Sequence, residues 1–176
     1  MQNLNREVKT IKNFSESHFI AGAQDHFRVE KIIVDSNDET LVRTMVKQIS
    51  TVKAETRIAA YCGSDYFYRM VLWDKDYIKN DVYPDMSKEY CNLDIVALNK
   101  LIIDDVFHID EEKYEDYVHS TRSYESCYKD IQDGKYDIMF IMNPVRVEQI
   151  RNITAMGERL PEVTISVFPK PSVGVI

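Results

Sequence analysis

The stretch YDIMFIM, residues 136–142, decides the fold, because five consecutive apolar residues follow its aspartate. An unbroken apolar run of this length predicts a strand that is covered on both faces. Asn143-Pro144 ends the run, and Pro144 suits the first turn of a helix that continues to Gly157. Upstream, a helix that starts after Thr121 is predicted to end at Gly134, since glycine readily adopts the left-handed conformation of a helix C-cap.

Working outward, the clearest β-hairpin joins TRIAAYC (56–62) to YFYRMVLW (66–73) through Gly63-Ser64-Asp65. Hydrophobic periodicity and capping residues predict the remaining elements. These are strands at 4–12, 28–34, 114–119 and 162–168, helices beginning at Ser15 and Asp38, a helix at 93–107 and a surface loop at 74–90. The pattern predicts a single α+β domain over residues 1–176, with a mixed β-sheet and helices packed mainly on one face.

Composition narrows the classes of function. The 176 residues include 22 Lys and Arg against 29 Asp and Glu, a net charge of −7, which disfavours nucleic-acid binding. No apolar run is long enough to span a bilayer, and the first residues are too polar for a signal peptide. Cys62, Cys91 and Cys127 are spaced for neither a disulfide framework nor a zinc site. We therefore expect three free thiols in a cytoplasmic protein.

Motifs that carry known chemistry are missing from the sequence. The five glycines are widely separated, so there is no phosphate-binding loop. No pair of cysteines or histidines has metal-ligand spacing; His18 and His26 share a helix face, where histidines are mostly structural. The acidic residues of 104–116 lack the ordered spacing of a calcium loop and predict a solvated connection. Neither a metal nor a cofactor is expected.

Several stretches resemble the family called domain of unknown function 1015. LDIVALNKLIIDDVFHID (93–110), DGKYDIMFIMNPVRVEQIRNITAMGERLP (133–161) and FPKPSVGVI (168–176) are similar to the end of that family, and residues 5–32 to its central segment. Family members also carry an N-terminal half that resembles ParB-like domains and contains an Asp-Gly-His-His-Arg motif, which this sequence lacks. Where the family has Met-Pro-Pro-Lys-Ser-Thr, this chain has LPEVTI (160–165), so Val163 replaces a lysine.

The resemblance implies a C-terminal module that is not catalytic alone and that completes or covers the site of a ParB-like half. The alternative is a domain that binds a small anion or a nucleotide, or a phosphotransferase connected with amino-acid metabolism. In that alternative Arg6, Asn143 and Lys170 converge on the anion. The expected partners are the ParB-like half and a small anionic ligand, with no nucleic acid and no membrane. No catalytic residue is assigned.

Overall fold

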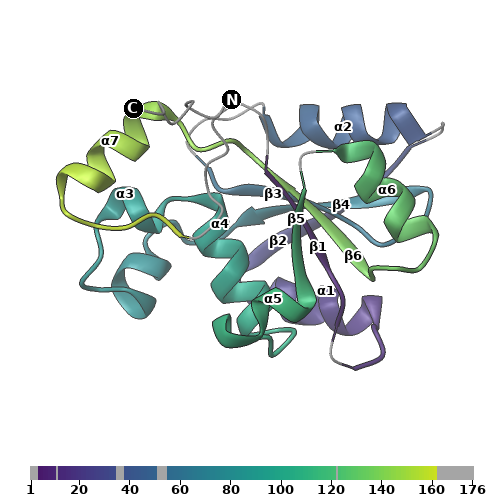
Figure 1. Cartoon of the computed structure of the whole chain (residues 1–176), viewed down its shortest axis with the longest axis horizontal. Coiled ribbons are helices and arrows are strands. Elements are labelled where there is room, and N and C mark those ends of the chain that lie inside the picture. Colours follow the sequence, from purple (N-terminus) through teal and green to yellow (C-terminus); the bar gives the residue numbers. More distant parts are fainter. Residues whose placement is uncertain (1–3, 11, 35–37, 51–54, 122, 162–176) are drawn as a thin grey trace, which may run out of the picture.

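The computed structural model describes residues 4–10, 12–34, 38–50, 55–121 and 123–161, which form one six-stranded sheet with helices on both faces (Figure 1). The strand order is β2-β4-β3-β6-β1-β5. The predicted single α+β domain is confirmed. The strands are β1 (Leu4–Val8), β2 (Phe27–Ile33), β3 (Arg57–Tyr61), β4 (Tyr66–Leu72), β5 (Val118–Thr121) and β6 (Ile138–Met142).

All described strand pairs are antiparallel, whereas a mixed sheet was expected. The physical reason lies in the connections. Helix α2 (Asp38–Ser50) joins β2 to β3, and α6 (Tyr124–Gln132) joins β5 to β6, as in units that build parallel sheets. In both units, however, an antiparallel strand lies between the two that the helix connects: β4 separates β2 from β3, and β1 separates β5 from β6.

Alternation along the strands divides the core between the two faces of the sheet. On the first face Ile58, Ala60 and Phe140 belong to the cluster that most of the helical elements cover, as predicted. These elements are α1 (Glu16–Gln24), η1 (Ile78–Val82), α3 (Lys88–Cys91), α4 (Asp94–Ala97), η2 (Leu98–Asp104) and α7 (Val147–Ala155). On the second face, α2 and α6 cover Ala59 and Met139 (Figure 1).

Several local predictions are confirmed. The Ser15 hydroxyl caps α1 by accepting from the His18 N–H at 3.4 Å. The hairpin of β3 and β4 forms as predicted, with Gly63 at a φ of 100°. All five residues of β6 are buried, so the apolar run is covered on both faces.

Other elements differ from prediction. The helix predicted at 93–107 is α4 followed by η2, a wider π-helix, and the predicted loop 74–90 contains η1 and α3. The strand predicted near 114–119 divides into α5 (Tyr114–Tyr117), which follows η3 (Glu111–Lys113), and then β5. Pro144 lies before α7 rather than in its first turn. The strand predicted at 162–168 lies outside the described residues.

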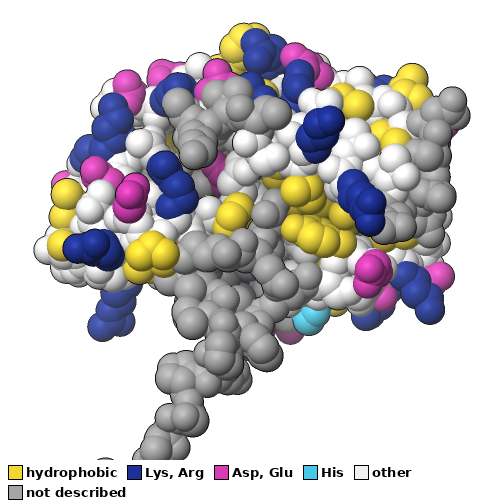
Figure 2. Space-filling view, turned by 90° about the horizontal axis from the view of Figure 1, so that it is seen from above, with side chains coloured by type: hydrophobic (Ala, Val, Ile, Leu, Met, Phe, Trp, Pro, Cys, Tyr) yellow, Lys and Arg dark blue, Asp and Glu magenta, His cyan; other side chains and the backbone are white. Residues whose placement is uncertain are grey.

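On the face of the molecule seen in Figure 2, neither positive nor negative side chains predominate, because Lys and Arg side chains are scattered among acidic and apolar ones. Cys62, Cys91 and Cys127 are all free thiols, as predicted. Within the described ranges, no helix combines the length and the apolar character that crossing a bilayer requires.

Candidate functional site

A cleft of about 570 Å³ opens at one end of the sheet. Its walls come from six parts of the chain that are distant in sequence. They are the C-terminal end of α2, the residues before β3, the turn after β4, α3, the start of α4 and the segment from β6 to α7. Because antiparallel strands and their crossovers bring these ends together, the cleft is a product of topology rather than of one loop.

Asn143, the first residue after β6, connects two walls of this cleft. Its backbone N–H and its side-chain Nδ2 both donate to Asp94 Oδ2, at 3.2 and 3.0 Å. Nδ2 also lies 3.4 Å from the carbonyl oxygen of Ile49, near the end of α2. Asn143 therefore ties the start of α4 to the end of α2.

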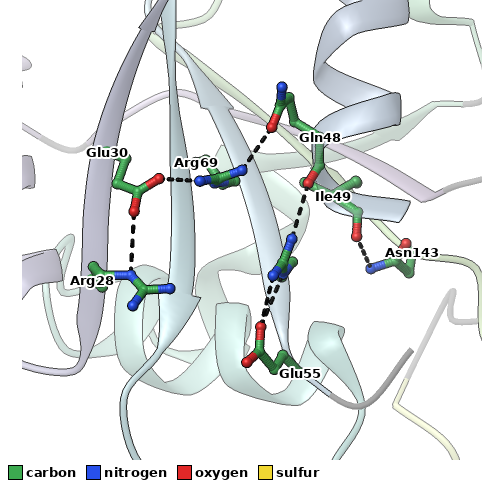
Figure 3. A network of polar contacts seen from close by, with 8 residues as sticks. Arg28, Glu30, Gln48, Ile49, Glu55, Arg69 and Asn143 are labelled. Carbon is green, nitrogen blue, oxygen red and sulfur yellow. Dashed lines mark hydrogen bonds and ion pairs between the residues drawn. The ribbon is translucent and has the colours of Figure 1, made fainter. Parts of the chain in front are cut away.

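A second set of polar contacts fixes the end of α2 from below (Figure 3). Carbonyl groups in the last turn of a helix lack partners within the helix and are stabilised by nearby cations. Arg57 Nη1 lies 3.5 Å from the carbonyl oxygen of Gln48, and its Nη2 donates to Glu55 Oε2 at 2.8 Å. Arg69 Nη1 donates to Gln48 Oε1 at 2.7 Å, and its Nη2 to Glu30. The wall that carries Glu55 is thus held by ion pairs.

Asp94 lines the cleft and is the titratable group most strongly affected by its position there. Burial raises the pKa of its carboxyl to about 7, although hydrogen bonds from Asn143 and from the Thr56 hydroxyl favour the ionised form. The two residues that hydrogen-bond to this carboxyl are both neutral. Near neutral pH, Asp94 can therefore both accept and donate a hydrogen bond in the cleft.

The remaining charged side chains of the cleft fall into two groups. Lys88 Nζ pairs with Asp76 Oδ1 at 3.0 Å, and Glu55 pairs with Arg57. Lys75 and Arg146, by contrast, form no ion pair with any acid among the described residues. Arg146 directs its Nε towards Gln149 Oε1 at 3.4 Å, a neutral partner. The cleft consequently offers two cations to a bound anion.

The structure describes two of the three residues predicted to converge, Arg6 and Asn143. Asn143 lines the cleft. Arg6 is not among the described lining residues; it lies buried in β1, opposite Phe140, where burial lowers its pKa. Lys170 lies outside the described residues, so the convergence of all three stays a prediction.

Sequence reasoning missed Asp94, Lys75 and Arg146. The N-cap residue of α4 is Leu93, and Asp94 takes the first helical position. The three residues stand in unrelated segments, and no motif links them. Only the position of Arg146 close to Asn143-Pro144, already expected to end a strand, could have drawn attention to it.

A second hollow, of about 260 Å³, lies between α1 and the end of η2. His18, His26 and His108 line it together with two aspartates, and His108 has a φ of 57°. The His26 ring stacks on that of Tyr77 with ring centroids 4.8 Å apart. In the part of the chain that the structure describes, no three His, Cys, Asp or Glu side chains are placed to hold a metal ion.

No family model, no curated protein and no solved structure matches this chain. The resemblance to domain of unknown function 1015 therefore rests on the stretches quoted above. The hypothesis that the chain completes or covers the site of a ParB-like half stays a prediction.

Proposed function

We propose that this chain is a binding module for a small anionic ligand, which occupies the cleft at the end of the sheet. The observation that carries the proposal is a pair of cations, Lys75 and Arg146, that form no ion pair with any described acid, in a cleft whose other lysine is paired. A cation beside a concave polar surface binds carboxylate or phosphate through charge-assisted hydrogen bonds.

The start of α7 supports the same proposal. The N-terminal turn of a helix carries partial positive charge, which favours an anion nearby. Arg146, the N-cap residue of α7, and Gln149, in its first turn, both line the cleft. The helix dipole and the Arg146 guanidinium therefore act on the same part of the cleft and with the same sign.

The proposal is for binding rather than for turnover. Asp94 is held by Asn143 and Thr56, and the acids Glu55 and Asp76 are held by Arg57 and Lys88. These contacts fix the walls of the cleft, which suits recognition of a ligand. A ligand-binding role also agrees with the alternative drawn from the sequence, although its cations are Lys75 and Arg146 rather than Arg6.

The test is titration of the chain with inorganic phosphate by isothermal calorimetry. Loss of one charged donor costs about 1.5–3 kcal/mol, so Arg146→Gln and Lys75→Gln should each weaken phosphate binding about tenfold or more. Lys129→Gln is the matched control, since Lys129 is an exposed lysine of α6 that does not line the cleft. Equal affinities in the wild type and both cleft variants would contradict the proposal.

A further inference from the structure

We infer that Asp94 makes the cleft selective for oxyanions that carry a proton, so that at alkaline pH the chain binds hydrogen phosphate and rejects sulfate. This inference rests on the proposed function and names the class of ligand that the same cleft accepts. It follows from the number of hydrogen bonds that the Asp94 carboxyl can make and from the groups that already occupy them.

An ionised carboxylate only accepts hydrogen bonds, and it has about four acceptor positions. Asn143 fills two of them, with its backbone N–H and its Nδ2, and the Thr56 hydroxyl fills a third. About one acceptor position is then left on a side chain that lines the cleft. A ligand that reaches it must bring a donor.

Oxyanions differ in whether they have such a donor. Hydrogen phosphate keeps one O–H group through the neutral and alkaline range, whereas sulfate is fully ionised and only accepts. Beside an ionised Asp94, a sulfate oxygen would face a carboxylate oxygen with no hydrogen between them. Both atoms are acceptors and both groups are negatively charged, so this contact opposes binding. Hydrogen phosphate would instead donate to the carboxylate while Lys75 and Arg146 neutralise its charge.

Protonation of Asp94 removes this discrimination. A neutral carboxyl has its own O–H and can donate to sulfate as well as to phosphate. The acceptor count sets the selectivity, and burial of Asp94, which raises its pKa to about 7, sets the pH at which selectivity begins. Sulfate binding is therefore coupled to uptake of a proton by Asp94, and hydrogen phosphate binding is not.

The other charged groups that line the cleft with Asp94 come from four parts of the chain. They are Glu55 before β3, Lys75 and Asp76 after β4, Lys88 of α3 and Arg146 before α7. Glu55 and Asp76 are already ion-paired, with Arg57 and Lys88. Asp94 is thus the carboxyl in the described lining without a cationic partner, and the one whose proton a ligand meets.

Calorimetric titration with sulfate and with inorganic phosphate, from about pH 6 to about pH 9, tests the inference. For the wild type, sulfate affinity should fall about tenfold for each pH unit above 7, as linkage to one proton requires. Phosphate affinity should fall much less, so the phosphate-to-sulfate ratio rises with pH. Repeating the sulfate titration in two buffers of different ionisation enthalpy should reveal uptake of up to one proton.

Two variants sharpen the result. Asp94→Asn replaces the carboxyl by an amide that both donates and accepts at every pH, so the affinity for sulfate should become independent of pH. Asp76→Asn, which removes another acid of the cleft, should keep the rise of the ratio with pH. Identical pH profiles for the two anions in the wild type would overturn the inference and leave the proposed function standing. If neither anion binds at any pH, the proposed function itself fails.

Discussion

β6 and β1 lie side by side in the sheet and are both buried, yet their side chains have opposite character. β6 consists of five apolar residues, all at most 1% exposed. β1 carries Asn5, Arg6 and Glu7, which are 0, 5 and 0% exposed. The comparison teaches that burial here follows the place of a strand in the sheet, between two neighbours and beneath helices, rather than its hydropathy.

The polar residues of β1 have different surroundings. Glu7 lies next to the Cys127 thiol of α6, and burial raises its pKa. Arg6 faces the opposite side of the sheet, where it interacts with Tyr114. Among the described residues, neither the oxygen nor the nitrogen of the Asn5 amide has a hydrogen-bond partner. An unsatisfied buried polar group destabilises the folded state, so β1 contains a destabilising group of a kind that the apolar β6 does not contain.

The largest effect is expected in β6. Phe140 is fully buried, and its ring contacts those of Phe19 and Phe107, with centroids 5.9 and 6.3 Å apart. Phe140→Ala should lower the free energy of unfolding by ~3–5 kcal/mol, because the lost ring leaves a cavity in a packed core. Chemical denaturation measures this change. A loss below ~1 kcal/mol would mean that β6 does not lie at the centre of the core.

The same two strands show what sequence can and cannot predict. β6 was predicted because its apolar run is a local property of residues 138–142. The start of β1 was also predicted, although the strand ends at Val8 rather than at residue 12. The burial of Asn5 and Glu7 could not be predicted, since in isolation these residues suggest a surface. Their burial depends on β5 and β6, which pair with β1 from the distant second half of the chain.

The candidate site divides in the same way. Asn143 was identified because it ends β6, a local signal. Asp94, Lys75 and Arg146 came to line one cleft through long-range pairings, of β4 with β2 and of β1 with β5 and β6, which no pattern in the sequence indicated. These three residues can therefore be identified as site residues only from the topology, whereas Asn143 can be identified from the local sequence at the end of one strand.

A smaller effect of opposite sign is expected in β1. Asn5→Val replaces an amide without hydrogen bonds by an apolar, β-branched side chain that suits a buried strand. Removing an unsatisfied buried group should raise the free energy of unfolding by about 1–2 kcal/mol. Chemical denaturation of the variant and the wild type at one pH measures the gain. Asn5→Ala serves as a control that removes the amide without filling its space, and it should be less stable than Asn5→Val. A destabilised Asn5→Val would show that the polar side chain is needed in β1.

The smallest effect concerns Glu7 and appears as a dependence on pH. Burial raises the pKa of Glu7 above its value in the unfolded chain, so the folded state binds its proton more tightly. The stability that this proton contributes is complete below the unfolded pKa and is lost as the pH rises through the folded pKa. Glu7→Gln carries no such proton, and the wild type should therefore lose stability relative to this variant as the pH rises from about 4 to about 8.

Denaturant unfolding of both proteins at each pH isolates Glu7, because Asp94 titrates in both and cancels in the difference. Glu125→Gln is the matched control, because it makes the same substitution at an exposed position of α6. A difference between wild type and Glu7→Gln that stays constant with pH would show that Glu7 is as well solvated as a surface acid. β1 would then resemble a strand at the surface rather than a strand that is buried like β6 but contains destabilising polar groups.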